Sequence, residues 1–121
     1  MAKIIASTMR AAEDTLRDLK NWLAVFKTEY EVPEEIIKVL DEKFEEIAKK
    51  VGDISCKIEG EEIEADEEQQ KEVEDIIRDT KNWIEVFKTE YEQQMKDEVK
   101  EKLFEKLESL AEKIRDIECK S

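Results

Sequence analysis

Pairs of carboxylates at helical spacing are the first residues in this sequence that could do chemistry. Asp14 and Asp18 lie four residues apart, as do Asp75 and Asp79, so each pair shares one side of a helix. Carboxylates in this arrangement are ligands that Mg²⁺ or Ca²⁺ accepts. An arginine lies within each pair, however, and solvated, ion-paired helix faces have the same pattern. We therefore predict that both pairs are solvated surface and that the chain holds no metal and no cofactor.

Other catalytic chemistry is limited by missing residue types. The chain contains no histidine, which excludes Ser-His-Asp triads, the usual zinc sites and Glu-x-x-His di-iron bundles. It also lacks glycine-rich phosphate loops and a nucleophile elbow. Cys56 and Cys119 form no Cys-x-x-Cys motif, so reduced thiols of an intracellular protein are favoured over a structural disulfide. The sequence predicts a non-enzymatic, cytoplasmic protein.

The charge balance restricts the partners. The 121 residues include 34 acids and 21 bases, a formal net charge of −13. The excess is concentrated in the second half, where residues 61–121 hold 21 acids and 11 bases. So negative a surface repels phosphates, and we expect no direct binding of nucleic acid and none of an anionic membrane. No apolar run reaches about 18 residues, so no transmembrane helix is predicted, and the first apolar stretch is too short for a signal peptide.

The composition predicts an all-α protein. Glycine occurs twice and proline once, too few for the many turns of a β-rich fold. The abundance of Glu, Lys and Ile is typical of thermophile proteins and equally of designed helical proteins. Composition alone therefore leaves both origins open.

An internal duplication organises the chain. Residues 13–31 match residues 74–92 at 14 of 19 positions, with an offset of 61. The match then continues at an offset of 63 and aligns Cys56 with Cys119, so two residues are inserted in the second copy. Insertions are tolerated in loops rather than in packed helices, so each copy is interpreted as a helical hairpin. The segments are repeat 1 at residues 1–58, an acidic linker at 59–66 and repeat 2 at 67–121.

Apolar residues in both copies follow the three-four spacing of helices that pack along a seam. Four such stripes predict tandem helical hairpins that form an antiparallel four-helix bundle. Apolar positions beside the main stripes widen each face, so each helix is expected to contact more than one neighbour. The stripes are Ile5, Met9, Ala12, Leu16, Leu19, Leu23, Phe26 and Tyr30; Ile37, Leu40, Phe44, Ile47, Val51, Ile54 and Ile58; Val73, Ile77, Thr80, Ile84, Phe87 and Tyr91; and Leu103, Leu107, Leu110, Ile114 and Ile117.

An alternative fold has three helices, the last being one long C-terminal helix from about Glu67 to Cys119 in a swapped dimer. The second copy has neither proline nor glycine where Pro33 separates the helices of the first. The phase of the stripes opposes this alternative, because the fourth stripe is displaced by about 200° from a continued third one. A turn near Glu92–Lys96 is favoured, with Asp97 as the N-cap of the last helix.

Helix boundaries have further signals. Asp66 is expected to cap the third helix, with Gln69 completing a capping box. Pro33 suits the first position of the second helix. Gly52 and Gly60 are positions where the second helix is expected to weaken or stop.

The aromatic feature that recurs in both copies is the first candidate for binding a partner. Trp22 and Val25 of the first copy are repeated as Trp83 and Val86 in the second. Tryptophan is enriched at the energetic centres of protein interfaces. Packing at the widened seam of the bundle explains the same residues, and this interpretation is favoured. The partner, if these residues bind one, is another protein or a second copy of the chain.

The acidic linker is the second candidate. It includes Glu61, Glu62 and Glu64 and contains no base. A solvated linker is the ordinary interpretation. Carboxylates also imitate phosphates against a basic groove, so an acidic inhibitor that mimics nucleic acid is the alternative function. The function we expect first is a structural or protein–protein interaction module.

Overall fold

The structure, a computed structural model, describes residues 2–119. Within that range the chain forms four long α-helices, two short strands and one 3₁₀ turn. The predicted all-α four-helix fold is confirmed, whereas the strands were not predicted. In chain order the elements are β1 (Lys3–Ile5), α1 (Ala6–Glu29), α2 (Glu34–Ser55), β2 (Glu62–Glu64), α3 (Glu67–Tyr91), η1 (Glu92–Gln94) and α4 (Asp97–Arg115).

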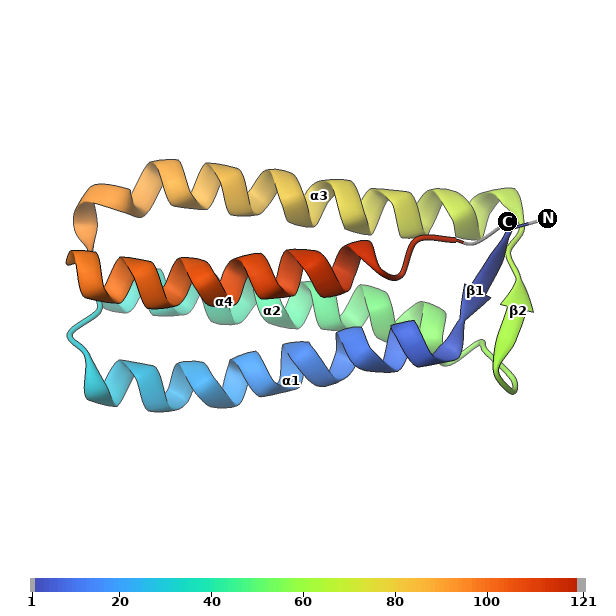
Figure 1. The fold of residues 1–121 in the computed structure, drawn as a ribbon, viewed down its shortest axis with the longest axis horizontal. Helices are drawn as coiled ribbons and strands as arrows, with labels where there is room; N and C mark the ends of the chain where they lie inside the picture. The colour runs from blue at the N-terminus through green and yellow to red at the C-terminus, as the bar shows by residue number, and fades with distance from the viewer. Residues whose placement is uncertain (1, 120–121) are drawn as a thin grey trace.

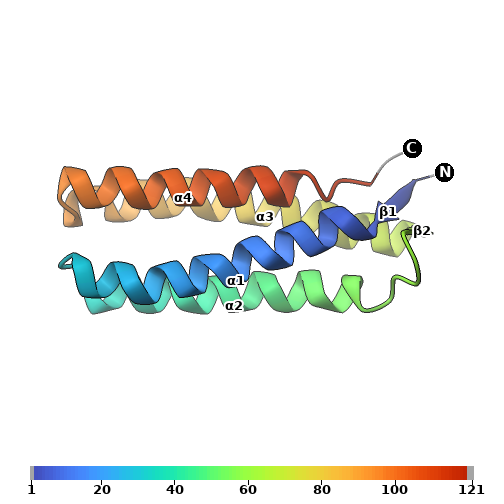
Figure 2. The ribbon, with the colours of Figure 1, turned by 60° about the horizontal axis from the view of Figure 1, so that its bottom comes forward.

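The helices lie side by side, each antiparallel to the next one in the chain (Figure 1). α1 packs against α2 and α4, and α3 packs against the same two helices. The diagonal pairs are therefore α1 with α3 and α2 with α4. The α1–α2 and α3–α4 loops lie at one end of the bundle, and the two strands lie at the other (Figure 2). We call β1 to α2 hairpin 1 and β2 to α4 hairpin 2.

The chain reverses between α3 and α4, so the alternative with one long C-terminal helix is not formed. Tyr91 ends α3, η1 makes a single turn, and Met95 is extended at φ −125° and ψ 147°. The predicted cap at Asp97 is wrong. Asp97 is the first residue of α4, and Lys96 precedes it without a side-chain capping bond. The acidic side chain instead lies in the first turn, where the helix dipole favours it.

The start of α3 carries the predicted capping box. The Gln69 backbone N–H donates to Asp66 Oδ1 at 2.8 Å, and the Asp66 N–H donates to Gln69 Oε1 at 3.1 Å. Pro33 lies one position earlier than predicted, at the N-cap of α2. Gly52 does not stop that helix, which continues to Ser55, because glycine in helical geometry costs only about 1 kcal/mol.

The acidic linker is more than a connection, because part of it forms β2. β2 pairs antiparallel with β1, and Ile4 faces Ile63 in the middle of this ribbon. Ile4 is fully buried. The expectation that the first helical stripe begins at Ile5 is therefore wrong, since Ile5 ends β1 and the helix begins at Ala6. The ribbon covers the end of the core that the helices alone leave open.

The core follows the predicted stripes with two exchanges, and Tyr30 and Ile58 of those stripes are only partly buried. Ile36 is buried in place of Ile37, and Ile76 is buried in place of Ile77. The predicted residues are partly buried and still pack against the core. Each helix of a four-helix bundle faces two neighbours, so its apolar face is broader than one stripe. Thr80 is the buried polar residue of the core among residues 2–119.

Candidate interaction surfaces

Trp22 lies at the seam between α1 and α4. Its ring stacks on Phe26, with centroids 4.4 Å apart and an interplanar angle of 19°. Lys106 Nζ of α4 lies 5.7 Å from the Trp22 ring centroid. The indole is partly buried against the core. A cation over an indole face is a stabilising contact of about 0.5–1 kcal/mol at exposed sites, so Trp22 joins the two hairpins.

Trp83 repeats this arrangement at the seam between α2 and α3. Its ring lies 5.2 Å from that of Phe87, and Lys43 Nζ of α2 lies 5.8 Å from its centroid. Because α1 and α3 are diagonal, the two seams are on opposite sides of the bundle. The structure thus places Trp22 and Trp83 apart, each packed between hairpins as the favoured interpretation expected.

Val25 and Val86 are the exposed large apolar residues of the described chain, 55% and 59% exposed. Each follows its tryptophan by three residues, so it lies next to the indole on the same helix face but farther from the core. The candidate Trp–Val pairs therefore each combine a packed ring with a solvated apolar side chain. The Trp22–Val25 pair and the Trp83–Val86 pair therefore belong to two separate surfaces, one at each seam.

The α2–α3 seam has a third apolar side chain, which the sequence analysis did not single out. Val39 lies four residues before Lys43, whose ammonium reaches Trp83. It also lies four residues after Glu35, whose charge acts on Tyr91 of α3. Residues four apart share a helix face, so Val39 lies alongside α3 between residues 83 and 91. We call Val39, Trp83 and Val86 the apolar patch.

Acidic residues surround the apolar patch. Glu35 and Glu42 of α2 and Glu90 of α3 are exposed and flank it by helical spacing. None of the three has an ion-pair partner among residues 2–119. We call Glu35, Glu42 and Glu90 the acidic rim.

The one lysine beside the patch is already engaged. Lys43 Nζ lies 3.3 Å from Glu46 Oε2, and Lys50 Nζ lies 3.4 Å from Glu46 Oε1. The Lys43 charge holds the pKa of Glu46 below its usual value, with a smaller contribution from Lys50. Both lysines therefore share the single carboxylate of Glu46, whereas none of the rim acids has an ion-pair partner in the described chain.

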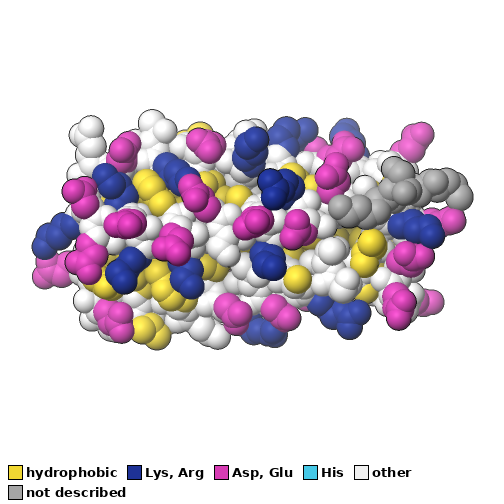
Figure 3. Space-filling view, viewed as in Figure 1, with side chains coloured by type: hydrophobic (Ala, Val, Ile, Leu, Met, Phe, Trp, Pro, Cys, Tyr) yellow, Lys and Arg dark blue, Asp and Glu magenta, His cyan; other side chains and the backbone are white. Residues whose placement is uncertain are grey.

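The α1–α4 seam differs from the α2–α3 seam at one important position. Lys102 occupies the place that corresponds to Val39 at the offset of 63. Its Nζ lies 5.8 Å from the Tyr30 ring centroid, and Lys106 is close by over Trp22. On the face that includes this seam, acidic and basic side chains are interspersed (Figure 3). The α1–α4 seam therefore lacks both the third apolar side chain and a uniform charge.

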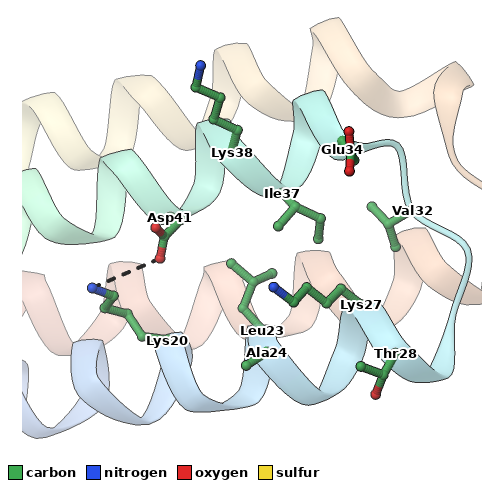
Figure 4. Close-up of a pocket in the computed structure, with 10 residues that line it drawn as sticks. All are labelled: Lys20, Leu23, Ala24, Lys27, Thr28, Val32, Glu34, Ile37, Lys38 and Asp41. Atoms are coloured by element: carbon green, nitrogen blue, oxygen red, sulfur yellow. Dashed lines mark ion pairs between the residues drawn. The ribbon is translucent and has the colours of Figure 1, made fainter.

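A groove with a volume of about 660 Å³ lies between α1 and α2. Leu23, Val32 and Ile37 form its apolar part, and lysines and acids lie around it (Figure 4). Lys20 Nζ lies 2.7 Å from Glu45 Oε1, a contact that raises the pKa of Lys20. Charges of both signs line the groove, so it selects no ligand by charge.

The acidic residues of the linker lie on the ribbon at the end of the bundle. Glu61, Glu62 and Glu64 are all exposed, as a surface for a basic partner requires. Glu62 Oε1 lies 3.0 Å from Lys3 Nζ, so one of the three charges is paired. The Glu61 carbonyl accepts a hydrogen bond from the Ala6 N–H at 2.8 Å. The segment therefore has a structural role besides its charge.

Arginine side chains form ion pairs with the carboxylates that were considered as metal ligands. Arg17 forms an ion pair with Asp14, and Arg78 lies 2.7 Å from Asp75 and 3.6 Å from Asp79. Within residues 2–119, no group of three or more Asp, Glu, Cys or His side chains is arranged to hold a metal ion.

The two cysteines are free thiols near the strand end of the bundle. Cys56 is exposed, and its Sγ lies 3.3 Å from the Asp53 carbonyl oxygen. Cys119 is partly buried, and this burial raises the pKa of its thiol, with Glu74 and Glu118 adding to the shift.

In the described part of the chain, no helix has the length and apolar character needed to cross a bilayer.

Comparison with known proteins adds no functional assignment. Searches against models of protein families, against curated proteins and against solved structures each found no match to this chain.

Proposed function

We propose that this protein is a non-enzymatic interaction module that binds a basic, amphipathic helix of a partner protein on the α2–α3 seam. The observation that carries this proposal is the apolar patch of Val39, Trp83 and Val86 inside an acidic rim. Solvated apolar side chains that adjoin a packed aromatic ring supply the apolar contact of an interface.

The charge of the chain determines which helix fits. The net charge of −13 attracts a cationic partner at long range, and the unpaired rim acids then face its lysines or arginines. A helix with apolar residues at positions i, i+3, i+4 and i+7 presents a stripe that matches the patch. Lysine or arginine on both sides of that stripe completes the match with Glu35, Glu42 and Glu90.

The test uses a fluorescently labelled synthetic helix with leucine at those four positions and lysine elsewhere. Its affinity is measured by fluorescence anisotropy for the wild-type chain and for Val86→Ser. Since full burial of a valine is worth about 1.5–3 kcal/mol, Val86→Ser is expected to weaken binding by about tenfold or more. Val25→Ser is the matched control, because Val25 occupies the same place in the other repeat and is equally exposed.

The comparison of the two variants decides the proposal. A large loss for Val86→Ser with less than a twofold change for Val25→Ser supports it. Equal losses, or no loss, would place the peptide elsewhere and overturn it. The triple variant of the rim, Glu35→Gln with Glu42→Gln and Glu90→Gln, is expected to slow association and reduce its salt dependence.

Mimicry of nucleic acid is the second candidate function, and the length of the acidic strip favours it. Beyond the rim, Glu46, Glu72, Asp75 and Asp79 continue the same side of α2 and α3 by helical spacing. Of these four acids Glu72 has no ion-pair partner in the described chain, while the other three are paired with Lys43, Lys50 or Arg78. Carboxylates in such a row imitate phosphates against a basic groove. If the protein mimics nucleic acid, its affinity for a cationic protein should fall steeply as salt is added. The Val86→Ser substitution should leave that affinity unchanged. The same two measurements therefore separate the candidates.

A further inference from the structure

The interface between the two hairpins has the same groups on both sides. Trp22 of hairpin 1 meets Lys106 of hairpin 2, with the ammonium 5.7 Å from the ring centroid. Trp83 of hairpin 2 meets Lys43 of hairpin 1, at 5.8 Å. The tryptophans correspond to each other in the repeat, and so do the lysines. This reciprocity is the property of an isologous interface between two identical subunits.

The β ribbon repeats the reciprocity at the end of the bundle. The Ala6 N–H donates to the Glu61 carbonyl at 2.8 Å, and the Ala65 N–H donates to the Ala2 carbonyl at 3.0 Å. Each bond is the twofold mate of the other about the central Ile4–Ile63 pair. β1 leads into α1 and β2 leads into α3, so the ribbon also joins hairpin 1 to hairpin 2.

A short hinge at residues 56–61 connects the hairpins and folds hairpin 2 back onto hairpin 1. Within it Gly60 has φ +84°, a backbone conformation that side-chain-bearing residues rarely adopt. Nothing lies within 4 Å of the position that a Cβ would take there. Glycine is therefore required by the backbone conformation of the turn and not by crowding.

From these observations we propose that two copies of the chain exchange hairpins. Hairpin 1 of one copy packs on hairpin 2 of the other, through the interface that each chain now makes with itself. The exchanged dimer keeps every Trp–Lys contact and the whole ribbon, while the hinge opens and no longer needs its reversed turn. Because the contacts are the same, protein concentration and hinge strain decide between monomer and dimer. The proposal is independent of the partner helix proposed for the α2–α3 seam, since that seam is present in both forms.

The first test alters the hinge alone. Gly60→Ala strains the closed turn and leaves the open hinge free, so the dimer dissociation constant is expected to fall at least about tenfold. Gly52→Ala is the matched control, because Gly52 lies in α2 and also has open space around its Cβ position. The readout is the light-scattering mass across a dilution series with reductant present. Equal dimer dissociation constants for the two variants would overturn the proposal. So would a monomeric light-scattering mass for both variants at every concentration.

The second test shows that hairpins are what is exchanged. Leu16→Pro breaks α1 of hairpin 1, and Ile84→Pro breaks α3 of hairpin 2. Mixing the two full-length variants supplies one intact copy of each hairpin, so helical circular dichroism is expected to rise above the average of the separate samples. Mixing Leu16→Pro with Leu23→Pro is the control, since both damage hairpin 1. A mixture of complementary variants that gains no more helix than this control contradicts hairpin exchange.

Discussion

Tyr30 and Tyr91 correspond to each other in the repeat and keep the same distance to the preceding phenylalanine ring, but only Tyr91 is buried. The ring centroids are 5.1 Å apart for Phe26 and Tyr30 and 5.0 Å apart for Phe87 and Tyr91. Tyr91 is 7% exposed in the last turn of α3. Tyr30 lies one residue beyond α1, with extended φ −127° and ψ 147°. The two residues inserted in the second copy, between Glu92 and Asp97, let α3 and η1 continue where α1 ends.

Burial of Tyr91 sets its titration. Loss of hydration raises the pKa of its phenol above 10.0, and the charges of Glu90 and Glu35 add to the shift. In the Tyr30→Phe variant Tyr91 is the only tyrosine, so its tyrosinate absorbance is expected to have a midpoint above pH 10. The same variant in denaturant should titrate near pH 10. A folded midpoint at or below the unfolded one would contradict the burial.

The same shift makes a prediction about alkaline stability. A raised folded-state pKa contributes stability that is complete below the unfolded value of about 10 and is lost as the pH rises through the folded value. The free energy of unfolding of the wild type is therefore expected to fall more steeply above pH 10 than that of Tyr91→Phe. Urea titrations at several alkaline pH values measure the difference. Parallel curves for the two proteins would show that Tyr91 is not responsible.

The capping box at α3 should contribute more than the acidic residue at α4. Asp66→Ala removes the side-chain acceptor of the Gln69 N–H while the backbone N–H of residue 66 can still donate to Gln69 Oε1, and it is expected to cost about 1 kcal/mol of unfolding free energy. Asp97→Ala removes a charge in the first turn of α4 and its exposed ion pair with Lys100, 3.4 Å long, a loss of about 0.3–1 kcal/mol. Chemical denaturation of both variants tests this order. A larger loss for Asp97→Ala would show that a cap at α4 had been missed.

The β ribbon should matter to stability although each strand is short. Ile4 is fully buried, and Ile4→Ala is expected to cost about 2–5 kcal/mol. Ile63 faces it across the ribbon but is partly exposed, so Ile63→Ala should cost less. If thermal unfolding of Ile4→Ala matches the wild type, the ribbon does not cover the core in solution.

Salt should stabilise the fold. The net charge of −13 produces self-repulsion, and most acids lack an ion-pair partner in the described chain. Screening of that repulsion between low and physiological ionic strength is expected to add about 1 kcal/mol, or about 4 °C in Tm. Calorimetry with sodium chloride measures it, with sucrose as the uncharged control. A Tm that falls with salt would mean that the ion pairs outweigh the repulsion.

The number of helices, their antiparallel order and most of the core follow from the amino-acid sequence alone. The three-four spacing and the phase change after Tyr91 determine these because they depend only on local helix geometry. The capping box at Asp66 could be predicted from the sequence for the same reason. The Trp–Val pairs were also found from the sequence, through their repetition.

The ribbon and the difference between the two seams depend on how the helices pack in three dimensions. β1 and β2 are each three residues long and far apart in sequence, so their pairing exists only once the bundle brings them together. Likewise, Val39 becomes part of a patch because α3 packs beside it, while its counterpart Lys102 lies over Tyr30 on the opposite side. Periodicity shows which face of a helix is apolar, but the identity of the neighbouring helix depends on the packing of the whole chain.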